Sequence, residues 1–179
     1  MDPLADANQT AALIAKMSAW VAGQAPDGQR DQWALVGLRR RGDVIAGRMA
    51  ESLGITNLGT LDITLYRDDL GGAGTVPMVG TTEIDFSLDG LDVVLVDDVL
   101  MTGRSIRAAL DAMADLGRPR RVWLAVLMDR GAETRELPIA ADFAAAVQSG
   151  PRSVEVRLRP GDSDEGVYLG ETAGEGVGI

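Results

Sequence analysis

Apolar residues along the chain recur in two spacings, which predict alternating helices and strands. Steps of three and four residues between apolar positions indicate amphipathic helices, whereas short unbroken runs such as WALVGL and DVVLV indicate buried parallel strands. The pattern predicts helices over residues 4–22, 43–53 and 105–116, with Asp43 as the N-cap of the second helix. It predicts strands over residues 33–38, 58–66, 83–86, 92–96, 121–128, 154–158 and 167–169.

Strands that alternate with helical stretches predict an α/β domain with a central, mostly parallel sheet flanked by helices. We expect one domain over residues 1–170 and a disordered tail over residues 171–179, where glycine and acidic residues dominate. Ligands of such sheets bind outside the carboxyl ends of the strands. This rule directs attention to three segments, at residues 39–42, 67–82 and 97–105.

Composition narrows the chemistry that these segments could perform. The 179 residues include neither cysteine nor histidine, which excludes disulfides, thiolate zinc sites and every catalytic triad built on those side chains. Any metal would be held by oxygen ligands, as Mg²⁺, Mn²⁺ or Ca²⁺ are.

Charge and hydropathy narrow the classes of partner. Seventeen basic and 27 acidic residues give a net charge of −10, which argues against a general binder of nucleic acids or membrane surfaces. Half of this excess comes from acidic residues after Arg159, at Asp162, Asp164, Glu165, Glu171 and Glu175. With neither a signal-peptide pattern nor an apolar run near the roughly 18 residues of a membrane span, we expect a cytoplasmic protein with no membrane partner.

The strongest candidate for chemistry is the run VVLVDDVLMTGRS at residues 93–105. A buried strand ends in two carboxylates, Asp97 and Asp98, and a short loop then leads into a helix. The helix N-terminus, Gly103 and the hydroxyls of Thr102 and Ser105 suit a phosphate group. The carboxylates would repel that phosphate, so they are expected to face ribose hydroxyls or a metal ion. The alternative is an acidic strand end followed by an ordinary helix cap.

Three further segments lie where the same crevice is expected. Arg39, Arg40 and Arg41, followed by a glycine, offer bidentate contacts to a polyphosphate, or else form a solvated turn or an RNA contact. Residues 67–82 form a long glycine-rich loop that begins with Arg67; it could close over an anionic substrate or be a surface insertion. The MDRG run at residues 128–131 ends a strand at the same edge, where Asp129 and Arg130 could simply pair.

With these segments in order, the chain resembles the type I phosphoribosyltransferases, which use 5-phosphoribosyl-1-diphosphate (PRPP). VVLVDDVLMTGRS is similar to the PRPP motif of that superfamily, and ALVGLRRRGDVIAGRMA to its first strand, pyrophosphate loop and helix. LDITLYRDDL, together with DRG followed by RELPI, resembles one branch, the PyrR family of pyrimidine operon regulators and uracil phosphoribosyltransferases. The resemblance covers most of residues 33–158 and implies a small hood and a long flexible loop.

The resemblance implies a role for each candidate residue. Asp97 and Asp98 would bind the ribose hydroxyls, directly or through Mg²⁺ held together with PRPP. Arg40 and Arg41 would bind pyrophosphate, and Arg67 would act from the closing loop. Arg130 and Val154 match nucleotide- or base-contacting positions near the hood. The 5-phosphate would be wrapped by Val99, Leu100, Met101, Thr102, Gly103, Arg104 and Ser105.

The implied reaction joins uracil to PRPP, giving UMP and pyrophosphate, and the implied second role is UMP-responsive binding of pyrimidine operon mRNA. A homodimer or a higher homo-oligomer is implied by the family alone. Two alternatives stay open: an RNA-binding nucleotide sensor with negligible catalysis, and a phosphoribosyltransferase for another base.

The segments that resemble the RNA-binding face of the family differ most from it. The family's Thr-Arg-Ile-Ala-His stretch is ALIAK at residues 12–16, and its DRG-His-Arg-Glu-Leu-Pro-Ile is DRGAETRELPI, so both histidines are absent. Because affinity for RNA rests on Lys and Arg contacts to phosphates, a local basic patch would have to compensate. The candidates for such a patch are Arg118, Arg120, Arg121, Arg152 and Arg157.

Overall fold

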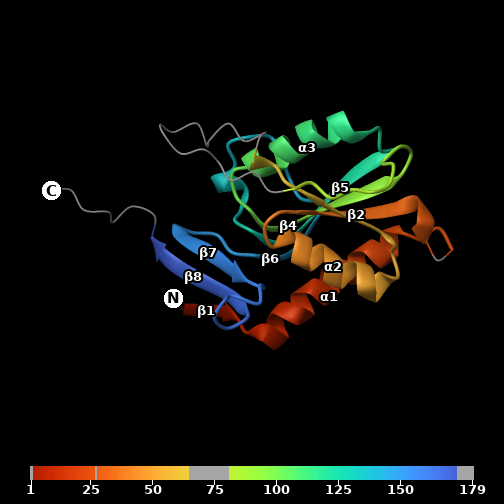
Figure 1. Cartoon of the computed structure of the whole chain (residues 1–179). Helices are drawn as coiled ribbons and strands as arrows, with labels where there is room; N and C mark the ends of the chain where they lie inside the picture. Colours follow the sequence, from red (N-terminus) through yellow and green to blue (C-terminus); the bar gives the residue numbers. More distant parts are fainter. Residues whose placement is uncertain (1, 27, 65–80, 173–179) are drawn as a thin grey trace.

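The computed structural model describes residues 2–26, 28–64 and 81–172, and over these residues it contains two β-sheets and three α-helices. The larger sheet has five parallel strands in the order β3-β2-β4-β5-β6 (Figure 1). Its strands are β2 (Trp33–Leu38), β3 (Asn57–Leu61), β4 (Asp92–Leu100), β5 (Arg121–Asp129) and β6 (Phe143–Val147). The predicted α/β fold with a central parallel sheet is confirmed.

Helices cover both faces of this sheet. The helices α1 (Ala7–Gln24) and α2 (Gly42–Leu53) lie on one face, and α3 (Arg104–Leu116) lies on the other (Figure 1). Alternate residues of each strand therefore enter different cores, since successive side chains point to opposite faces. In β4, for example, Val94 and Val96 pack with α1 and α2, whereas Val93 and Leu95 pack with α3.

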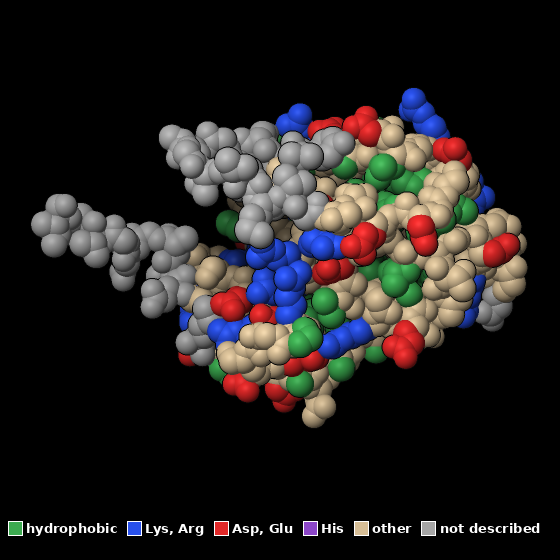
Figure 2. Space-filling model, viewed as in Figure 1, with side chains coloured by type: hydrophobic (Ala, Val, Ile, Leu, Met, Phe, Trp, Pro, Cys, Tyr) green, Lys and Arg blue, Asp and Glu red, His purple; other side chains and the backbone are tan. Residues whose placement is uncertain are grey.

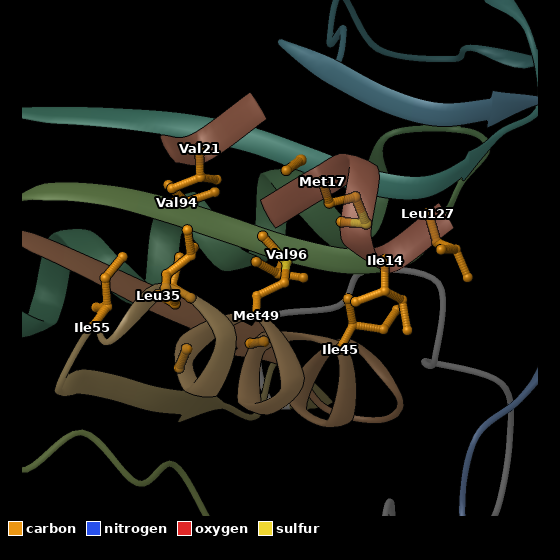
Figure 3. Close-up of a cluster of buried hydrophobic side chains, with 14 of the residues drawn as sticks. Ile14, Met17, Val21, Leu35, Ile45, Met49, Ile55, Val94, Val96 and Leu127 are labelled. Atoms are coloured by element: carbon orange, nitrogen blue, oxygen red, sulfur yellow. The ribbon is translucent and has the colours of Figure 1, made fainter. Parts of the chain in front are cut away.

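The core on the α1 and α2 face is built from buried side chains of both helices and of β2, β4 and β5, with Val156 and Val167 of the smaller sheet at its edge. Figure 3 shows Met17 of α1 and Met49 of α2 close to Val96 of β4. Each of these three side chains has no exposed surface, and burial of one such side chain contributes about 1.5–3 kcal/mol. This packing holds α2 firmly against the sheet, which matters because the loop before α2 forms one wall of the site.

The smaller sheet, which we call the hood, is antiparallel and lies at one end of the molecule. It consists of β1 (Asp2–Ala5), β8 (Gly166–Thr172) and β7 (Arg152–Arg157), in that order (Figure 1). The N-terminal strand thus pairs with the last strand of the chain, Pro3 with Tyr168. β8 runs two residues past the predicted domain boundary at residue 170, and the tail beyond it lies outside the described residues.

Two strands were missed by the sequence analysis. Residues 2–5 form β1, so the predicted helix over 4–22 begins only at Ala7, where Asp6 is the N-cap and exchanges hydrogen bonds with Gln9. β6 reads FAAAV, a composition without a clear strand pattern, and it is held by parallel pairing to β5.

Several predicted boundaries were also wrong. Asp43 is not the N-cap of α2, because Arg41 occupies that position with φ 77° and without a side-chain cap. The predicted strand over residues 58–66 ends at Leu61, and that over residues 83–86 is only a bridge between Glu83 and Thr60. The loop predicted over residues 67–82 lies almost wholly outside the described residues. Over the described part of the chain, no helix has the length and apolarity of a membrane span.

Candidate functional site

Most of the predicted site residues meet at the carboxyl edge of the five-stranded sheet. β2 and β4 are parallel neighbours with Gly37 opposite Val96, so the segments that follow both strands emerge side by side. Between them lies a pocket of about 360 Å³. The predicted residues that line it are Arg39, Arg40, Arg41, Asp97, Asp98, Val99 and Ser105, and three residues without an assigned role join them, namely Leu38, Ile63 and Thr64.

Two glycines allow this convergence. A Cβ atom on Gly42 would lie 2.4 Å from the carbonyl oxygen of Val96, and one on Gly37 would lie 2.5 Å from Cα of Asp43. Only residues without a side chain fit at these distances, so the first turn of α2 rests directly on the backbone of β2 and β4. The loop at residues 39–42, which we call the pyrophosphate loop, is thereby held against the end of β4.

The acidic pair, Asp97 and Asp98, does not end its strand as predicted but lies within β4, which continues to Leu100. Oδ1 of Asp97 accepts a hydrogen bond from the backbone N–H of Asp98, and Oδ1 of Asp98 accepts one from Val99, both at 2.9 Å. Burial raises the pKa of Asp98, although a hydrogen bond with Asp97 and the charge of Arg41 act in the opposite direction. The ionised Asp98 is thus short of compensating positive charge.

The donor set of the acidic pair fits a magnesium ion shared with a substrate. The described residues contain no group of three or more carboxylate, histidine or cysteine ligands, so the protein offers two carboxylates and not a closed metal cage. Mg²⁺ in phosphate sites is commonly held by one or two carboxylates, with water and substrate oxygens completing the shell. The uncompensated charge on Asp98 agrees with a cation at this position.

The arginines of the pyrophosphate loop have donors to spare. The Nε atoms of Arg39 and Arg41 are buried and bond to no other described residue. Arg39 approaches Glu83 at 3.4 Å, and Arg41 approaches Asp162 of the hood at 3.9 Å. Arg40 is exposed at the pocket, and the peptide bond between Arg39 and Arg40 is cis. Guanidinium groups placed in this way could bind a polyphosphate in bidentate fashion.

The segment that we call the phosphate loop, residues 99–105, runs from the last two residues of β4 into the first turn of α3. Gly103 is the N-cap of α3 with φ 89°, a conformation that favours glycine, and no side chain caps the helix. The N–H groups that follow Arg104 in the first turn of α3, together with the positive end of the helix dipole, could therefore face an anion. Ser105 lines the pocket, whereas Leu100 is buried and the hydroxyl of Thr102 accepts a hydrogen bond from the N–H of Arg104.

Seven described residues of the predicted site do not line this pocket, namely Leu100, Met101, Thr102, Gly103, Arg104, Arg130 and Val154. The side chain of Arg104 pairs with Glu136 at 2.6 Å. Arg130 is buried, and it donates to the carbonyl oxygens of Gln148 (2.8 Å) and Gly150 (2.5 Å). Val154 lies in β7 of the hood and packs on the core, and Arg67 lies outside the described residues.

Ionic contacts between the hood and the core were missed by the sequence analysis. Asp162, in the turn between β7 and β8, faces Arg41, and Glu165 makes a bidentate ion pair with Arg48 of α2 at 2.6 and 2.9 Å. Both acids belong to the acidic segment after Arg159, where only a general excess of negative charge was evident. A local pattern cannot reveal them, because their partners lie in an element far away along the chain.

The structure divides the arginines proposed for a basic patch between two places. Three of them precede or begin β5 at the amino edge of the sheet, and two lie in β7 of the hood. Figure 2 shows basic and acidic side chains intermixed on one face of the molecule. Three of the five arginines pair with acids: Arg120 with Asp92, Arg152 with Asp2 at 2.7 Å, and Arg157 with Glu155 at 2.8 Å. These five arginines therefore do not form the single patch that the sequence suggested.

Comparison with solved structures identifies the fold. A hypoxanthine phosphoribosyltransferase from Trypanosoma cruzi matches with a TM-score of 0.71 and 17% identity, over 96% of this chain and 95% of that one. A purine phosphoribosyltransferase from Pyrococcus horikoshii matches with a TM-score of 0.61 and 23% identity, over 80% of this chain and 85% of that one. At these identities the match establishes a shared fold.

Comparison of sequences identifies the family. Residues 1–147 match the family described as the phosphoribosyl transferase domain. The bifunctional protein PyrR of Roseiflexus sp. (strain RS-1) is 53% identical over 139 residues, 75% of this chain and 75% of that protein. The bifunctional protein PyrR of Thermus thermophilus is 51% identical over 148 residues, 79% of this chain and 81% of that protein. The acidic pair, the arginine loop and the glycine-capped helix thus stand in a chain that belongs to the PyrR family of phosphoribosyltransferases.

Proposed function

We propose that this protein is a uracil phosphoribosyltransferase that converts uracil and PRPP to UMP and pyrophosphate. The observation that carries the proposal is the pocket in which the pyrophosphate-loop arginines face the acidic pair beside the N-terminus of α3. These three features match the three polar parts of PRPP: its pyrophosphate, its ribose hydroxyls and its 5-phosphate. Family membership supports the same reaction.

In the proposed reaction the bond between the anomeric carbon and a pyrophosphate oxygen breaks, and a bond from that carbon to a uracil nitrogen forms. The nitrogen loses its proton, and pyrophosphate leaves with the bonding electron pair. Negative charge accumulates on the leaving group, so Arg40 and Arg41 would stabilise it electrostatically, with a contribution from the spare Nε donor of Arg41. Arg67 is proposed to act from the loop outside the described residues.

Asp97 and Asp98 would hold the ribose hydroxyls, which fixes the anomeric carbon between the two phosphate sites. Bound Mg²⁺ would add positive charge next to the ribose and pyrophosphate oxygens. The phosphate loop, from Val99 to Ser105, would bind the 5-phosphate through backbone N–H groups and the Ser105 hydroxyl. Arg130 holds the carbonyl oxygens of Gln148 and Gly150, so we place it as a support for the nucleotide site, with Val154 on the hood side.

As a member of the PyrR family, the protein is also proposed to bind pyrimidine operon mRNA in response to UMP and to form a homodimer or a higher homo-oligomer. RNA binding would depend on exposed basic residues, and the pairing of Arg120, Arg152 and Arg157 with acids reduces their share in it. Location in the cytoplasm stays a prediction.

One incubation tests the enzyme against its alternatives: purified protein with PRPP, Mg²⁺ and each free base in turn. Product with uracil alone supports the proposal. Product with a purine or with orotate would show a phosphoribosyltransferase for another base. Absence of product with every base, combined with salt-sensitive binding of a pyrimidine leader RNA that UMP strengthens, would show a nucleotide-sensing regulator without catalysis.

A further inference from the structure

The segment that follows β5 packs directly on the backbone of the phosphate loop. It contains a short 3₁₀ helix (Ala132–Thr134) and continues to Ile139. The carbonyl oxygen of Thr102 accepts hydrogen bonds from the N–H groups of Glu136 (3.0 Å) and Leu137 (3.2 Å). A Cβ atom on Gly103 would lie 3.3 Å from Cβ of Ile139, so the two segments are in close contact.

Arg135 is the centre of this contact. Its side chain is 11% exposed, and its guanidinium pairs with Oδ1 of Asp129, at the end of β5, at 2.5 Å. The same guanidinium donates to the carbonyl oxygens of Met101 (2.5 Å) and Leu100 (3.3 Å) in the phosphate loop. The hydroxyl of Thr134 lies 3.1 Å from the carbonyl oxygen of Met101 and 2.9 Å from that of Gly131, and its one proton is shared between these two acceptors. One arginine thus ties two neighbouring strand ends together through a carboxylate and two carbonyls.

Together with the backbone hydrogen bond from the N–H of Arg130 to the carbonyl oxygen of Leu100 (2.9 Å), these bonds orient the peptide groups of the phosphate loop. In a planar trans peptide the C=O and the next N–H point in opposite directions. The carbonyl groups of Leu100, Met101 and Thr102 all point toward the segment after β5. The N–H groups of the following residues, Met101, Thr102 and Gly103, are therefore directed away from that segment. Successive N–H groups directed to one side form an anion-binding concavity, here next to the N-terminus of α3.

We infer that Arg135 is a positioning residue that holds the phosphate loop in its anion-binding conformation, and that Thr134 assists it. The inference rests on the proposed function, since it assigns the 5-phosphate to this loop. Arg135 does not line the pocket, so it acts on the phosphate through the peptide groups of Leu100 and Met101. The pyrophosphate loop is held by other contacts, from Gly37 and Gly42, and does not depend on Arg135.

Calorimetry with UMP and with inorganic pyrophosphate, each measured separately, tests the inference. UMP carries the phosphate assigned to the phosphate loop, whereas pyrophosphate is assigned to the pyrophosphate loop. In Arg135→Lys the charge next to Asp129 stays, but one ammonium group cannot reach the carboxylate and both carbonyls. We expect the Kd for UMP to rise about 10- to 100-fold, the equivalent of one lost charge-assisted hydrogen bond, and the Kd for pyrophosphate to change less than about twofold. The matched control is Arg107→Lys, an exposed arginine of α3 that pairs with Asp111 and should bind both ligands as the wild type does.

Thr134→Val provides a second test that leaves the ion pair intact, and we expect a weaker effect in the same direction, about three- to tenfold for UMP. If Arg135→Lys does not fold, Thr134→Val decides the matter. Unchanged affinity for UMP in a folded variant, or equal weakening of UMP and pyrophosphate, overturns the inference. Wild-type protein that bound neither ligand would overturn the proposed function, and the inference with it.

Discussion

Arg41 of the pyrophosphate loop and Asp162 of the hood face each other, with Nη2 and Oδ1 3.9 Å apart. Oδ2 of Asp162 accepts hydrogen bonds from the N–H groups of Leu158 (2.8 Å) and Arg159 (2.9 Å), so its position is fixed by its own turn. The guanidinium of Arg41 also acts on Asp98 across the pocket. A cation proposed to bind pyrophosphate is thus shared between a carboxylate of the site and a carboxylate of the hood.

The first prediction follows from this shared charge. A carboxylate near Arg41 repels an incoming anion, so Asp162→Asn should bind inorganic pyrophosphate more tightly, by about 1.5- to fivefold, the range of an exposed ion pair. Asparagine keeps an oxygen for the N–H groups of Leu158 and Arg159. Calorimetry at about 0.05 M and 1 M salt provides the check, because screening should abolish the gain at high salt. Equal affinities of variant and wild type at low salt would show that Asp162 does not compete for Arg41.

Asp162 also makes the stability of the hood sensitive to acid. Hydrogen bonds from its own turn, led by that from Arg159, and the charges of Arg41 and Arg159 lower its pKa. The folded state therefore gains stability from Asp162 above the usual carboxyl pKa of about 3.9 and loses it as the pH falls through the lowered folded value. We expect the wild type to melt at a higher temperature than Asp162→Asn at pH 7. The two melting temperatures, followed by circular dichroism, should converge under acidic conditions.

The second carboxylate of the acidic pair has the opposite pH dependence. Burial raises the pKa of Asp98, so its ionised form costs stability above the folded pKa and costs none below the unfolded value of about 3.9. Asp98→Asn should thus melt at a higher temperature than wild type at pH 8, without ligand or Mg²⁺, and the difference should shrink as the pH is lowered. A variant that melts lower at pH 8 would mean that attraction to Arg41 outweighs desolvation.

Catalytic turnover should depend strongly on both carboxylates of the acidic pair. Replacement of both Asp97 and Asp98 by Asn removes two charged acceptors for the ribose hydroxyls and for Mg²⁺. Each charge-assisted hydrogen bond contributes about 1.5–3 kcal/mol, so kcat/KM should fall about 10²- to 10⁴-fold. The formation of UMP from PRPP and uracil measures this loss, and circular dichroism verifies the fold. Wild-type turnover in the double variant would refute the assignment of the ribose site.

The close approach of α2 to β4 predicts different outcomes for two glycines of one helix. In Gly42→Ala the new Cβ would meet the carbonyl oxygen of Val96 at 2.4 Å, so α2 must shift, at a cost of about 1–3 kcal/mol. The melting temperature should fall. The affinity for pyrophosphate should fall as well, because the pyrophosphate loop directly precedes this helix. Gly47→Ala is the matched control, because it has nothing within 4 Å and should be stabilised by up to about 1 kcal/mol. Equal stability of the two variants would contradict the role given to Gly42.

Much of the fold followed from the sequence because its signals are local. The strand over residues 33–38 has the predicted bounds, and α3 begins one residue before its predicted start. A short unbroken apolar run is typical of a strand buried on both faces, and a glycine just before a polar helix start is typical of a loop that leads into a helix N-terminus. β1 and β6 lacked such signals, since they are short and are held by pairing with β8 and β5.

The sequence by itself determined the elements of the parallel α/β core, the acidic pair, the pyrophosphate loop and the phosphate loop, because the signal for each element or loop lies in a short run of consecutive residues. Only the tertiary structure decided how these parts are held together. Asp162 reaches Arg41 because the turn between β7 and β8 of the hood lies beside α2, and Arg135 reaches Met101 because β4 and β5 end side by side. Arg130, which the sequence analysis expects near the nucleotide, donates to two carbonyl groups that lie after β6, a contact that no local pattern indicates. Charges separated along the chain carry no periodic signal, so their partners are selected only when the folded backbone brings them within a few ångströms.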